Sequence, residues 1–241
     1  MRESMNRVFG AAIAGYFAGN TDEKLIIHRE DGFTQQYDMA QYFDKEPAGF
    51  EYHALSRASG RVWDIGCGAG RTLLALAERG IAATGIDCSQ EAIAVSRARG
   101  AANAVRLDIL NAPLAPRQVD SFMLFGNNIG LAGSWSGALR LLERLRLAAA
   151  PGARLWCDSI DICAPALTRS RDYARRNIAA GRPPGLTISR LQYNSRLSLA
   201  EGWLFLSLDE LQTLAIQTGW TIEEQWQDVE KGPWLAELRA D

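Results

Sequence analysis

A glycine-rich loop and one aspartate have the residue types and the spacing of a cofactor-binding site. Gly66, Gly68 and Gly70 follow a run with β-branched and aromatic residues at 61–65, and a helical pattern starts directly after them. Glycine allows a tight turn and lets the backbone approach a ligand closely at the start of a helix. Asp87 ends the next apolar run, where a carboxylate can bind the hydroxyls of a ribose. Together these residues predict a site for an adenosyl cofactor in an α/β domain.

The spacing of the glycines separates this loop from other phosphate-binding loops. No Gly-Lys-Ser or Gly-Lys-Thr sequence follows it, which excludes a P-loop. The dinucleotide fingerprint needs its third glycine inside the helix, whereas here Gly70 is followed by Arg71 and Thr72. A nicotinamide or flavin enzyme is therefore disfavoured, and a plain tight turn is the other alternative.

Strand and helix patterns alternate around this loop. Strands are predicted at 61–65, 82–86, 104–107, 119–125 and 154–158, and helices at 70–79, 89–99 and 134–149. Pro151 and Gly152 are expected to separate the last of these helices from the strand that follows it. This alternation predicts a parallel sheet with right-handed crossovers.

The alternation is absent on both sides of this region. Asp31-Gly32 between extended runs predicts a hairpin over 26–37. Ser207 and Glu210 form a capping-box pattern that opens a helix ending at Gly219. Further elements are predicted as a helix at 165–180, a hairpin at 187–206 and closing strands at 220–227 and 234–238. We therefore expect an N-terminal cap segment at 1–58 and a main domain at 59–241, with an insertion at about 160–206.

These motifs resemble those of the class I S-adenosylmethionine (SAM)-dependent methyltransferases. The resemblance rests on Asp-Ile-Gly-Cys-Gly-Ala-Gly-Arg at 64–71, on Gly-Ile-Asp-Cys-Ser at 85–89 and on Leu107-Asp108, and it covers roughly 61–158. It implies a Rossmann-like α/β fold with a seven-stranded, mostly parallel sheet whose last strand is antiparallel. It also implies SAM as the methyl donor, with S-adenosylhomocysteine as the product.

The resemblance implies a role in cofactor binding for each matching residue. Asp87 would bind the ribose hydroxyls, Cys88 would pack on the adenine face, and Asp108 would receive the adenine amino group. The implied cofactor-binding set is Asp64, Gly66, Cys67, Gly68, Gly70, Asp87, Cys88, Asp108, Ile109 and Phe125. The alternatives are a helix cap for Asp87 and a solvated loop acid for Asp108.

Two adjacent amides follow the fourth predicted strand, where open α/β sheets place their ligands. Asn127 and Asn128 could hydrogen-bond the nucleophile or the substrate body, or they could serve the turn itself. Enzymes of this kind that methylate nucleic-acid amino groups carry Asn or Asp followed by Pro-Pro and an aromatic residue here, a pattern that this chain lacks. The segment is more similar to that of small-molecule enzymes.

Several residues of the expected cover are candidates for the acceptor side of the site. His53 is a candidate general base, although a packed or surface histidine is the more ordinary alternative. Tyr16, Tyr42 and Tyr193 are candidates for closing the pocket around the transferred methyl group. A metal-assisted mechanism is disfavoured, because only Asp158 and Asp161 could begin such a site.

Charge and cysteine usage limit the partners and the location. The net charge of −2 offers no general attraction for nucleic acid, and the cysteines form no Cys-x-x-Cys pair. A reducing cytoplasm fits this usage. The apolar stretch at 8–19 is too short to span a membrane, and Glu3 argues against a signal peptide, so we expect a packed helix.

The insertion is rich in arginine. Between 169 and 196, Asp172 is the one acidic residue. The arginines in this range are Arg169, Arg171, Arg175, Arg176, Arg182, Arg190 and Arg196. Either they form a lid that recognises an acidic substrate, or they are a solvated helix face or pair with an acidic surface of another subunit.

The expected function is methyl transfer from SAM to a small-molecule acceptor, with nitrogen or oxygen as the favoured acceptor atom and specialised metabolism as the favoured setting. Neither a membrane nor a nucleic acid is expected as a partner. The alternatives are a methyltransferase that acts on RNA or protein, and a SAM-binding protein without catalysis.

Overall fold

The computed structural model describes residues 4–44 and 50–241. Parts of the expected cap segment, residues 1–3 and 45–49, lie outside the described residues. The chain divides into two compact units. The first unit comprises 1–48, 64–109 and 188–201, and the second comprises 49–63, 110–187 and 202–241.

The larger sheet has the predicted strand arrangement. Its order is β11-β12-β7-β6-β3-β4-β5. The bounds are β3 Val62–Ile65, β4 Ala83–Asp87, β5 Ala104–Arg106, β6 Val119–Leu124, β7 Ala149–Ile160, β11 Trp220–Gln227 and β12 Pro233–Ala240. Strand β4 pairs with β5 in parallel and β6 pairs with β7 in parallel, whereas β12 is antiparallel to both β7 and β11. The mostly parallel sheet with an antiparallel last strand is therefore confirmed.

In the first unit, two helices follow the strands that carry the glycine loop and Asp87. Helix α3 (Arg71–Glu78) follows β3, and α4 (Gln90–Ala98) follows β4. The Ser89 hydroxyl accepts a hydrogen bond from the Ala92 amide at 3.2 Å and so caps α4. Helix α1 (Met5–Phe17) packs against α4 and buries Val8 and Ile13, which confirms the predicted packed helix.

A small sheet joins the N-terminal segment to the insertion. Its strands are β1 (Leu25–Arg29), β2 (Thr34–Tyr37), β8 (Leu186–Tyr193), β9 (Arg196–Leu197) and β10 (Glu201–Leu204). The predicted hairpin at Asp31-Gly32 is confirmed by the antiparallel pairing of β1 with β2. Strand β1 also pairs with β8, from Ile26 opposite Gln192 to Arg29 opposite Ser189. A short helix, η1 (Met39–Tyr42), follows β2.

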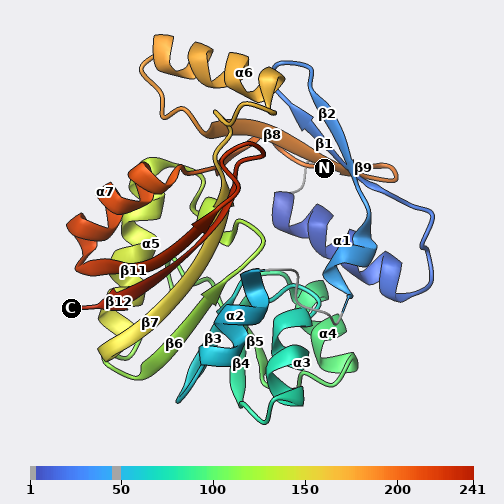
Figure 1. Cartoon of the computed structure of the whole chain (residues 1–241). Coiled ribbons are helices and arrows are strands. Elements are labelled where there is room, and N and C mark those ends of the chain that lie inside the picture. The colour runs from blue at the N-terminus through green and yellow to red at the C-terminus, as the bar shows by residue number, and fades with distance from the viewer. Residues whose placement is uncertain (1–3, 45–49) are drawn as a thin grey trace. The chain divides into compact units, whose positions relative to one another are not determined.

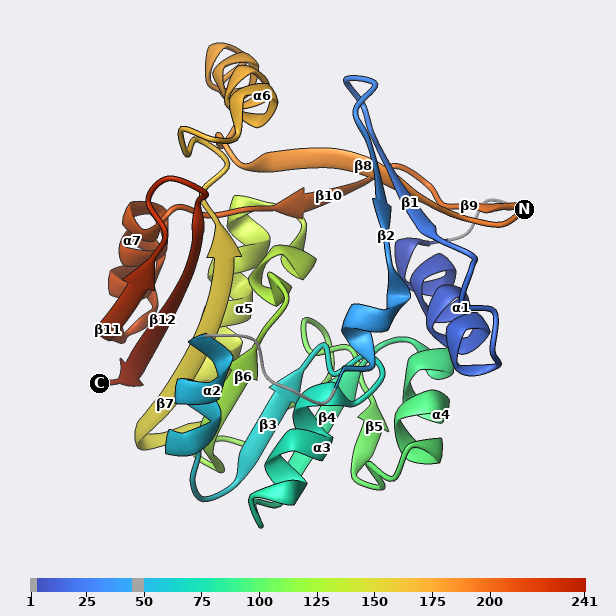
Figure 2. The ribbon, with the colours of Figure 1, turned by 45° about the vertical axis from the view of Figure 1, so that its right-hand side comes forward.

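The second unit contains the remaining helices. They are α2 (Phe50–Arg57), η2 (Asn128–Ala132), α5 (Trp135–Ala148), α6 (Thr168–Ala179) and α7 (Leu208–Thr218). Helices α5 and α7 lie side by side (Figures 1 and 2). The capping box of Ser207 and Glu210 is present at the start of α7, and Gly219 ends the helix with a φ of 75°. The sequence prediction for this helix is therefore confirmed.

One prediction about strand β7 is wrong. Pro151 and Gly152 were expected to precede the strand, but β7 begins at Ala149 and includes them. The pairing passes from Ala149 to Arg154 on β7 while β6 advances only from Val119 to Ser121. The extra residues form a bulge, in which the sheet tolerates a proline and a glycine with a φ of 72°.

Buried tryptophans organise the core of the second unit. Trp156, Trp220 and Trp234 are almost fully buried. The indole N–H of Trp220 donates to the Leu142 carbonyl at 3.1 Å, and that of Trp234 donates to the Leu206 carbonyl at 2.7 Å. These hydrogen bonds remove the cost of burying the polar edge of each ring.

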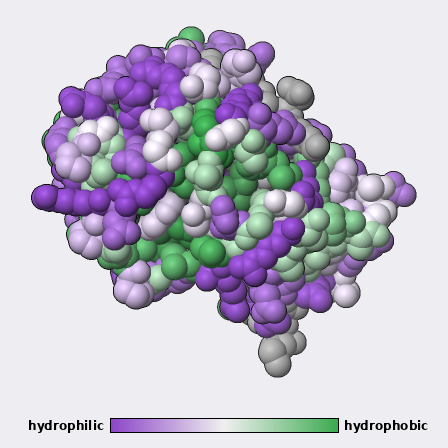
Figure 3. Space-filling model, turned by 90° about the horizontal axis from the view of Figure 1, so that it is seen from below, coloured by the Kyte–Doolittle hydropathy of each residue, from purple (hydrophilic) through white to green (hydrophobic). Residues whose placement is uncertain are grey.

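Hydrophilic residues cover most of the face drawn in Figure 3, with apolar residues gathered between them. Within the part of the chain that the structure describes, no helix has the length and hydropathy needed to cross a membrane.

Candidate functional site

The glycine loop lies in the first unit and is tied to the neighbouring strand. The amides of Gly66 and Cys67 both donate to the Ile86 carbonyl, at 2.7 and 3.1 Å. Gly68 has a φ of 51°, and a Cβ added there would meet no atom within 4 Å. Gly70 has a φ of 80°, and its Cβ would lie 2.4 Å from Ser96 Oγ. The loop therefore needs Gly68 for an open backbone face and Gly70 for close packing against α4.

Asp87 connects this loop to the start of α4. Its Oδ2 accepts from the Gly68 amide at 3.0 Å, and its Oδ1 accepts from the Ser89 amide at 2.8 Å. Burial raises the pKa of the Asp87 carboxyl, and these amide hydrogen bonds act in the opposite direction. Ser89 itself provides the side-chain cap of the helix. Each carboxylate oxygen of Asp87 keeps capacity to accept a further hydrogen bond from a ligand hydroxyl.

The two cysteines of the predicted set are unreactive packing residues. Cys67 is buried and Cys88 is partly buried. Burial raises the pKa of the Cys88 thiol to about 11 and raises that of Cys67 further. Both side chains are therefore neutral near pH 7 and present an apolar surface.

The ends of β4 and β5 lie together, as predicted. The Leu107 amide donates to the Asp87 carbonyl at 2.9 Å, which places Asp108 just beyond this contact. Asp108 is exposed, whereas Ile109 and Asp64 are buried. In the first unit the structure thus brings the glycine loop, Asp87 and the 107–109 segment to the carboxyl ends of adjacent strands.

In the second unit, the segment after β6 is held by the end of β7. Asp158 accepts from the Gly126 amide at 3.0 Å and from the Asn127 amide at 2.6 Å. Asn127 has a left-handed backbone with a φ of 59°, and Asn128 begins η2. Phe125 is buried at the end of the same strand. The turn explanation for Asn127 is thus correct for its backbone.

The side chain of Asn127 is oriented by a residue that sequence reasoning missed. Ser159 Oγ donates to Asn127 Oδ1 and accepts from the Leu206 amide at 3.2 Å. Asn127 Nδ2 is buried and has no hydrogen-bond partner among the described residues. The amide therefore presents its N–H group rather than its oxygen. The available sequence signal was the position of Asp158 and Ser159 at the end of the next parallel strand.

His53 lies elsewhere in the second unit, on α2 against β11 and β12. Its Nε2 is 3.1 Å from Arg57 Nη1 and 3.6 Å from Glu224 Oε2, and its ring centre is 4.7 Å from that of Trp226. The hydrogen bond from Arg57 holds the pKa of the Glu224 carboxyl below its usual value. A role for His53 as a base stays a hypothesis.

His53 also belongs to a group of potential metal ligands. His53, Glu224 and Glu237 place their ligand atoms within 4.8 Å of one another. Arg57 Nη1 lies 3.1 Å from His53 Nε2, 2.8 Å from Glu224 Oε1 and 3.1 Å from Glu237 Oε2. The guanidinium therefore supplies the positive charge that these ligands would otherwise need from a cation.

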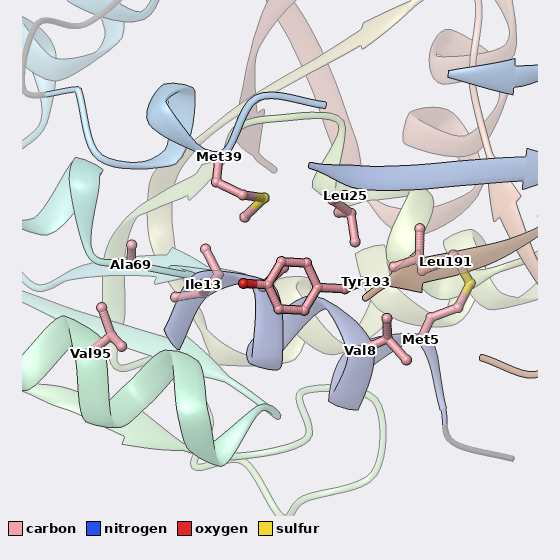
Figure 4. Close-up of a cluster of buried hydrophobic side chains, with 10 residues drawn as sticks. Met5, Val8, Ile13, Leu25, Met39, Ala69, Val95, Leu191 and Tyr193 are labelled. Carbon is pink, nitrogen blue, oxygen red and sulfur yellow. The ribbon is translucent and has the colours of Figure 1, made fainter. Parts of the chain in front are cut away.

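The three candidate tyrosines gather in one apolar cluster of the first unit. Tyr193 is buried among side chains of α1 and its neighbours (Figure 4), and its hydroxyl donates to Glu23. Burial and this contact raise the pKa of Tyr193 to about 12. Tyr16 packs on Phe43 at 4.7 Å between ring centres, and Tyr42 and Phe9 meet edge to face. Their place near an acceptor stays a prediction.

Most of the arginines of α6 are exposed to solvent. Arg169, Arg175 and Arg176 are exposed, and Arg175 pairs with Asp172 at 2.9 Å. A pocket of about 270 Å³ in the same unit lies between the segment after β7 and the start of α7, and Asp161 and Glu210 are among its lining residues. The lid for an acidic substrate stays a hypothesis.

Comparison with known proteins identifies the domain. A family model described as a methyltransferase domain matches residues 62–152. No curated protein sequence matches the chain. A SAM-dependent methyltransferase from Bacteroides fragilis, solved with S-adenosyl-L-homocysteine, is 22% identical with a TM-score of 0.82, over 99% of this chain and 97% of that chain.

Two other solved structures are similar. One was solved in work on the conversion of a disulfide bond into a thioacetal group during echinomycin biosynthesis. Its sequence is 26% identical to this chain, and the two structures match with a TM-score of 0.54 over 80% of this chain and 82% of that chain. The other is a SAM-bound amino pentose methyltransferase of calicheamicin biosynthesis from Micromonospora echinaspora; it is 14% identical with a TM-score of 0.50, over 78% and 86%.

Residues 62–152 therefore match a methyltransferase domain, and the chain has the Rossmann-like fold of a solved SAM-dependent methyltransferase.

Proposed function

We propose that this enzyme transfers the methyl group of SAM to a nitrogen or oxygen atom of a small-molecule acceptor, with the cofactor held by the glycine loop and Asp87. The observation that carries the cofactor assignment is the hydrogen bond from the Gly68 amide to Asp87 at 3.0 Å. It lies beside open space, because a Cβ added at Gly68 would meet no atom within 4 Å. This arrangement leaves room for a ligand against the loop and a carboxylate beside it to bind hydroxyl groups.

The residues that would hold the cofactor come mainly from the first unit. Asp87 would accept from the ribose hydroxyls, and the neutral Cys88 would pack on the adenine. The first unit would supply Asp64, Gly66, Cys67, Gly68, Gly70, Asp87, Cys88, Asp108 and Ile109. Phe125 of the second unit is included on the sequence resemblance alone.

The chemistry asks little of the protein beyond alignment. SAM supplies an activated methyl group, so the side chains need only bind, orient and exclude water. Asn127 and Asn128 are proposed to face the acceptor, and Asn127 would donate from Nδ2 to an acceptor oxygen or nitrogen because Ser159 engages its Oδ1. Tyr16, Tyr42 and Tyr193 are proposed to lie near the acceptor.

A small-molecule acceptor is supported by two similar proteins, which act in echinomycin and calicheamicin biosynthesis. The absence of the Pro-Pro pattern after Asn127 and a net charge of −2 also disfavour nucleic acid. The main domain at 59–241, with a cap segment at 1–58 and an insertion at about 160–206, remains part of the proposal. The four free cysteines support a cytoplasmic location.

The test is calorimetric titration of the protein with S-adenosylhomocysteine, followed by a screen of small amines, phenols and carboxylic acids for uptake of radiolabelled methyl from SAM. Asp87→Ala should abolish binding, whereas Asp172→Ala, at an exposed position of α6, should not. Absence of binding by the folded wild-type protein would overturn the cofactor assignment. Methylation of RNA or protein but of no small molecule would overturn the acceptor assignment.

A further inference from the structure

Arg99, at the end of α4, lies between the glycine loop and the N-terminal segment of the first unit. Its Nη1 donates to the Ala69 carbonyl at 2.6 Å, and its Nη2 donates to the Phe43 carbonyl at 2.7 Å. The guanidinium carbon also lies 4.7 Å from the centre of the Phe43 ring. One planar group thus holds two backbone carbonyls that are distant in sequence.

The carbonyl that Arg99 holds belongs to the cofactor loop itself. Ala69 stands between Gly68, whose outer backbone face is open, and Gly70, which starts α3. Both glycines have positive φ, so the peptide groups around Ala69 have few steric restraints of their own. A charged donor makes a stronger hydrogen bond to a carbonyl than a neutral donor does. Arg99 therefore fixes a part of the loop that would otherwise have conformational freedom.

The other carbonyl belongs to a segment that packs on the same loop. Ala69 is part of the apolar cluster that contains Ile13 and Met39 (Figure 4), and Tyr42 and Phe43 pack against this cluster. The positive charge of Arg71, the first residue of α3, also acts on the Tyr42 hydroxyl and opposes the rise in its pKa caused by burial. The segment 39–43 therefore packs on the loop and lies within the electrostatic influence of the start of α3.

Helix α1 reinforces this contact next to Asp87. A Cβ at Gly10 would lie 2.1 Å from Ser89 Oγ, so α1 approaches the start of α4 as closely as a glycine allows. The N-terminal segment thus packs on the glycine loop and on the start of α4.

We propose that Arg99 is a positioning residue that couples occupancy of the glycine loop to the conformation of residues 39–43. The inference rests on the proposed role of the loop in binding SAM. A ligand against Gly68 restricts the loop, and Arg99 transmits that restriction to the Phe43 carbonyl. Because coupling between two sites is reciprocal, an ordered 39–43 segment in turn strengthens cofactor binding.

The test combines calorimetry with hydrogen–deuterium exchange, and S-adenosylhomocysteine is the probe. Arg99→Met should weaken binding about tenfold, the effect of losing the hydrogen bonds of one charged donor. In the wild-type protein the probe should slow exchange in 39–43, and in Arg99→Met at saturating probe this protection should be lost. Arg99→Lys should be intermediate, since an ammonium group replaces one of the two contacts.

Arg97→Met is the matched control. Arg97 is an exposed arginine of the same helix, and its Nε donates to the Ala104 carbonyl of β5 at 2.8 Å instead. The Arg97→Met variant should bind the probe with wild-type affinity, and the probe should slow hydrogen–deuterium exchange in 39–43 as it does in the wild type. Equal affinity and equal protection in Arg99→Met would overturn the inference. If Arg99→Met does not fold, unchanged affinity and protection in Arg99→Lys would do so, whereas loss of binding in the wild type would count against the cofactor assignment instead.

Discussion

Asp158 holds the turn that carries Asn127: the Asn127 amide donates to Asp158 Oδ1 at 2.6 Å. Asn127 has a left-handed backbone, which an asparagine tolerates better than most side chains. The end of β7 therefore fixes the backbone of Asn127, which follows the neighbouring parallel strand β6. The next residue of β7, Ser159, then orients the side-chain amide.

Removal of this orienting hydroxyl should affect turnover and spare cofactor binding. Ser159→Ala frees Asn127 to rotate, so methyl transfer to the acceptor identified by screening should fall about tenfold, as expected for one lost buried hydrogen bond. Ser136→Ala, at an exposed position of α5, is the control. An equal loss in both variants, or a matching loss of S-adenosylhomocysteine affinity in Ser159→Ala alone, would contradict the proposed role of Asn127.

The two loop glycines should differ when each is replaced by alanine. Gly68→Ala strains a positive φ in open space and should cost about 1–2 kcal/mol of unfolding free energy. Gly70→Ala adds a contact at 2.4 Å with Ser96 Oγ, and overpacking should raise the total to about 2–4 kcal/mol. Denaturant unfolding measures both values. Gly68→Ala should nevertheless lose S-adenosylhomocysteine binding, and retention of full affinity would show that the open face is not the ligand face.

Local sequence signals predicted the elements that carry the proposed cofactor residues. The glycines, the apolar run before Asp87 and the capping box at Ser207 each depend on neighbours within a few residues, and the structure has each element there. The pairing of Ile26 with Gln192 could not be predicted in the same way. Local alternation shows that a strand forms, but it does not specify a distant partner.

The contacts of Ser159 and Arg99 were also beyond sequence reasoning. Each depends on where the ends of separate elements meet, and neither residue belongs to a recognised motif. The bulge at Pro151 and Gly152 was missed for a different reason, since these residues usually end a strand. Only the register with β6 shows that the sheet continues through them.

Asp87 should give the cofactor affinity a characteristic pH dependence. Burial raises its pKa above the ordinary value of 3.8, and the ionised carboxylate is the better acceptor for ribose hydroxyls. Affinity for S-adenosylhomocysteine should therefore fall on acidification while ordinary aspartates are still ionised. Calorimetry between about pH 4.5 and 8 checks this. A flat profile across that range would contradict an essential charged Asp87.

The raised pKa of Asp87 should also make the unfolding free energy depend on pH. Cofactor affinity is expected to rise with pH, whereas the contribution of Asp87 to stability is expected to fall. The folded pKa of Asp87 lies above its unfolded value, so its protonated form stabilises the protein at low pH, and this contribution is lost as pH rises through the folded pKa. The difference in unfolding free energy between wild type and Asp87→Ala, measured without ligand, should shift in favour of the variant as pH rises. A shift in favour of the wild type would mean that the amide hydrogen bonds from Gly68 and Ser89 outweigh burial.

His53 should prove dispensable for methyl transfer. Its Nε2 is held by Arg57 at 3.1 Å, and its ring packs on Trp226, so the side chain serves the contact of α2 with β11. His53→Gln should keep turnover and should lower the unfolding free energy by about 1 kcal/mol through the lost ring contact. Arg57→Gln should cost more, about 3 kcal/mol, because Glu237 is fully buried and loses one of the two arginine partners that it has among the described residues. If turnover of His53→Gln instead falls sharply and its pH profile loses one limb, the result would support His53 as a general base.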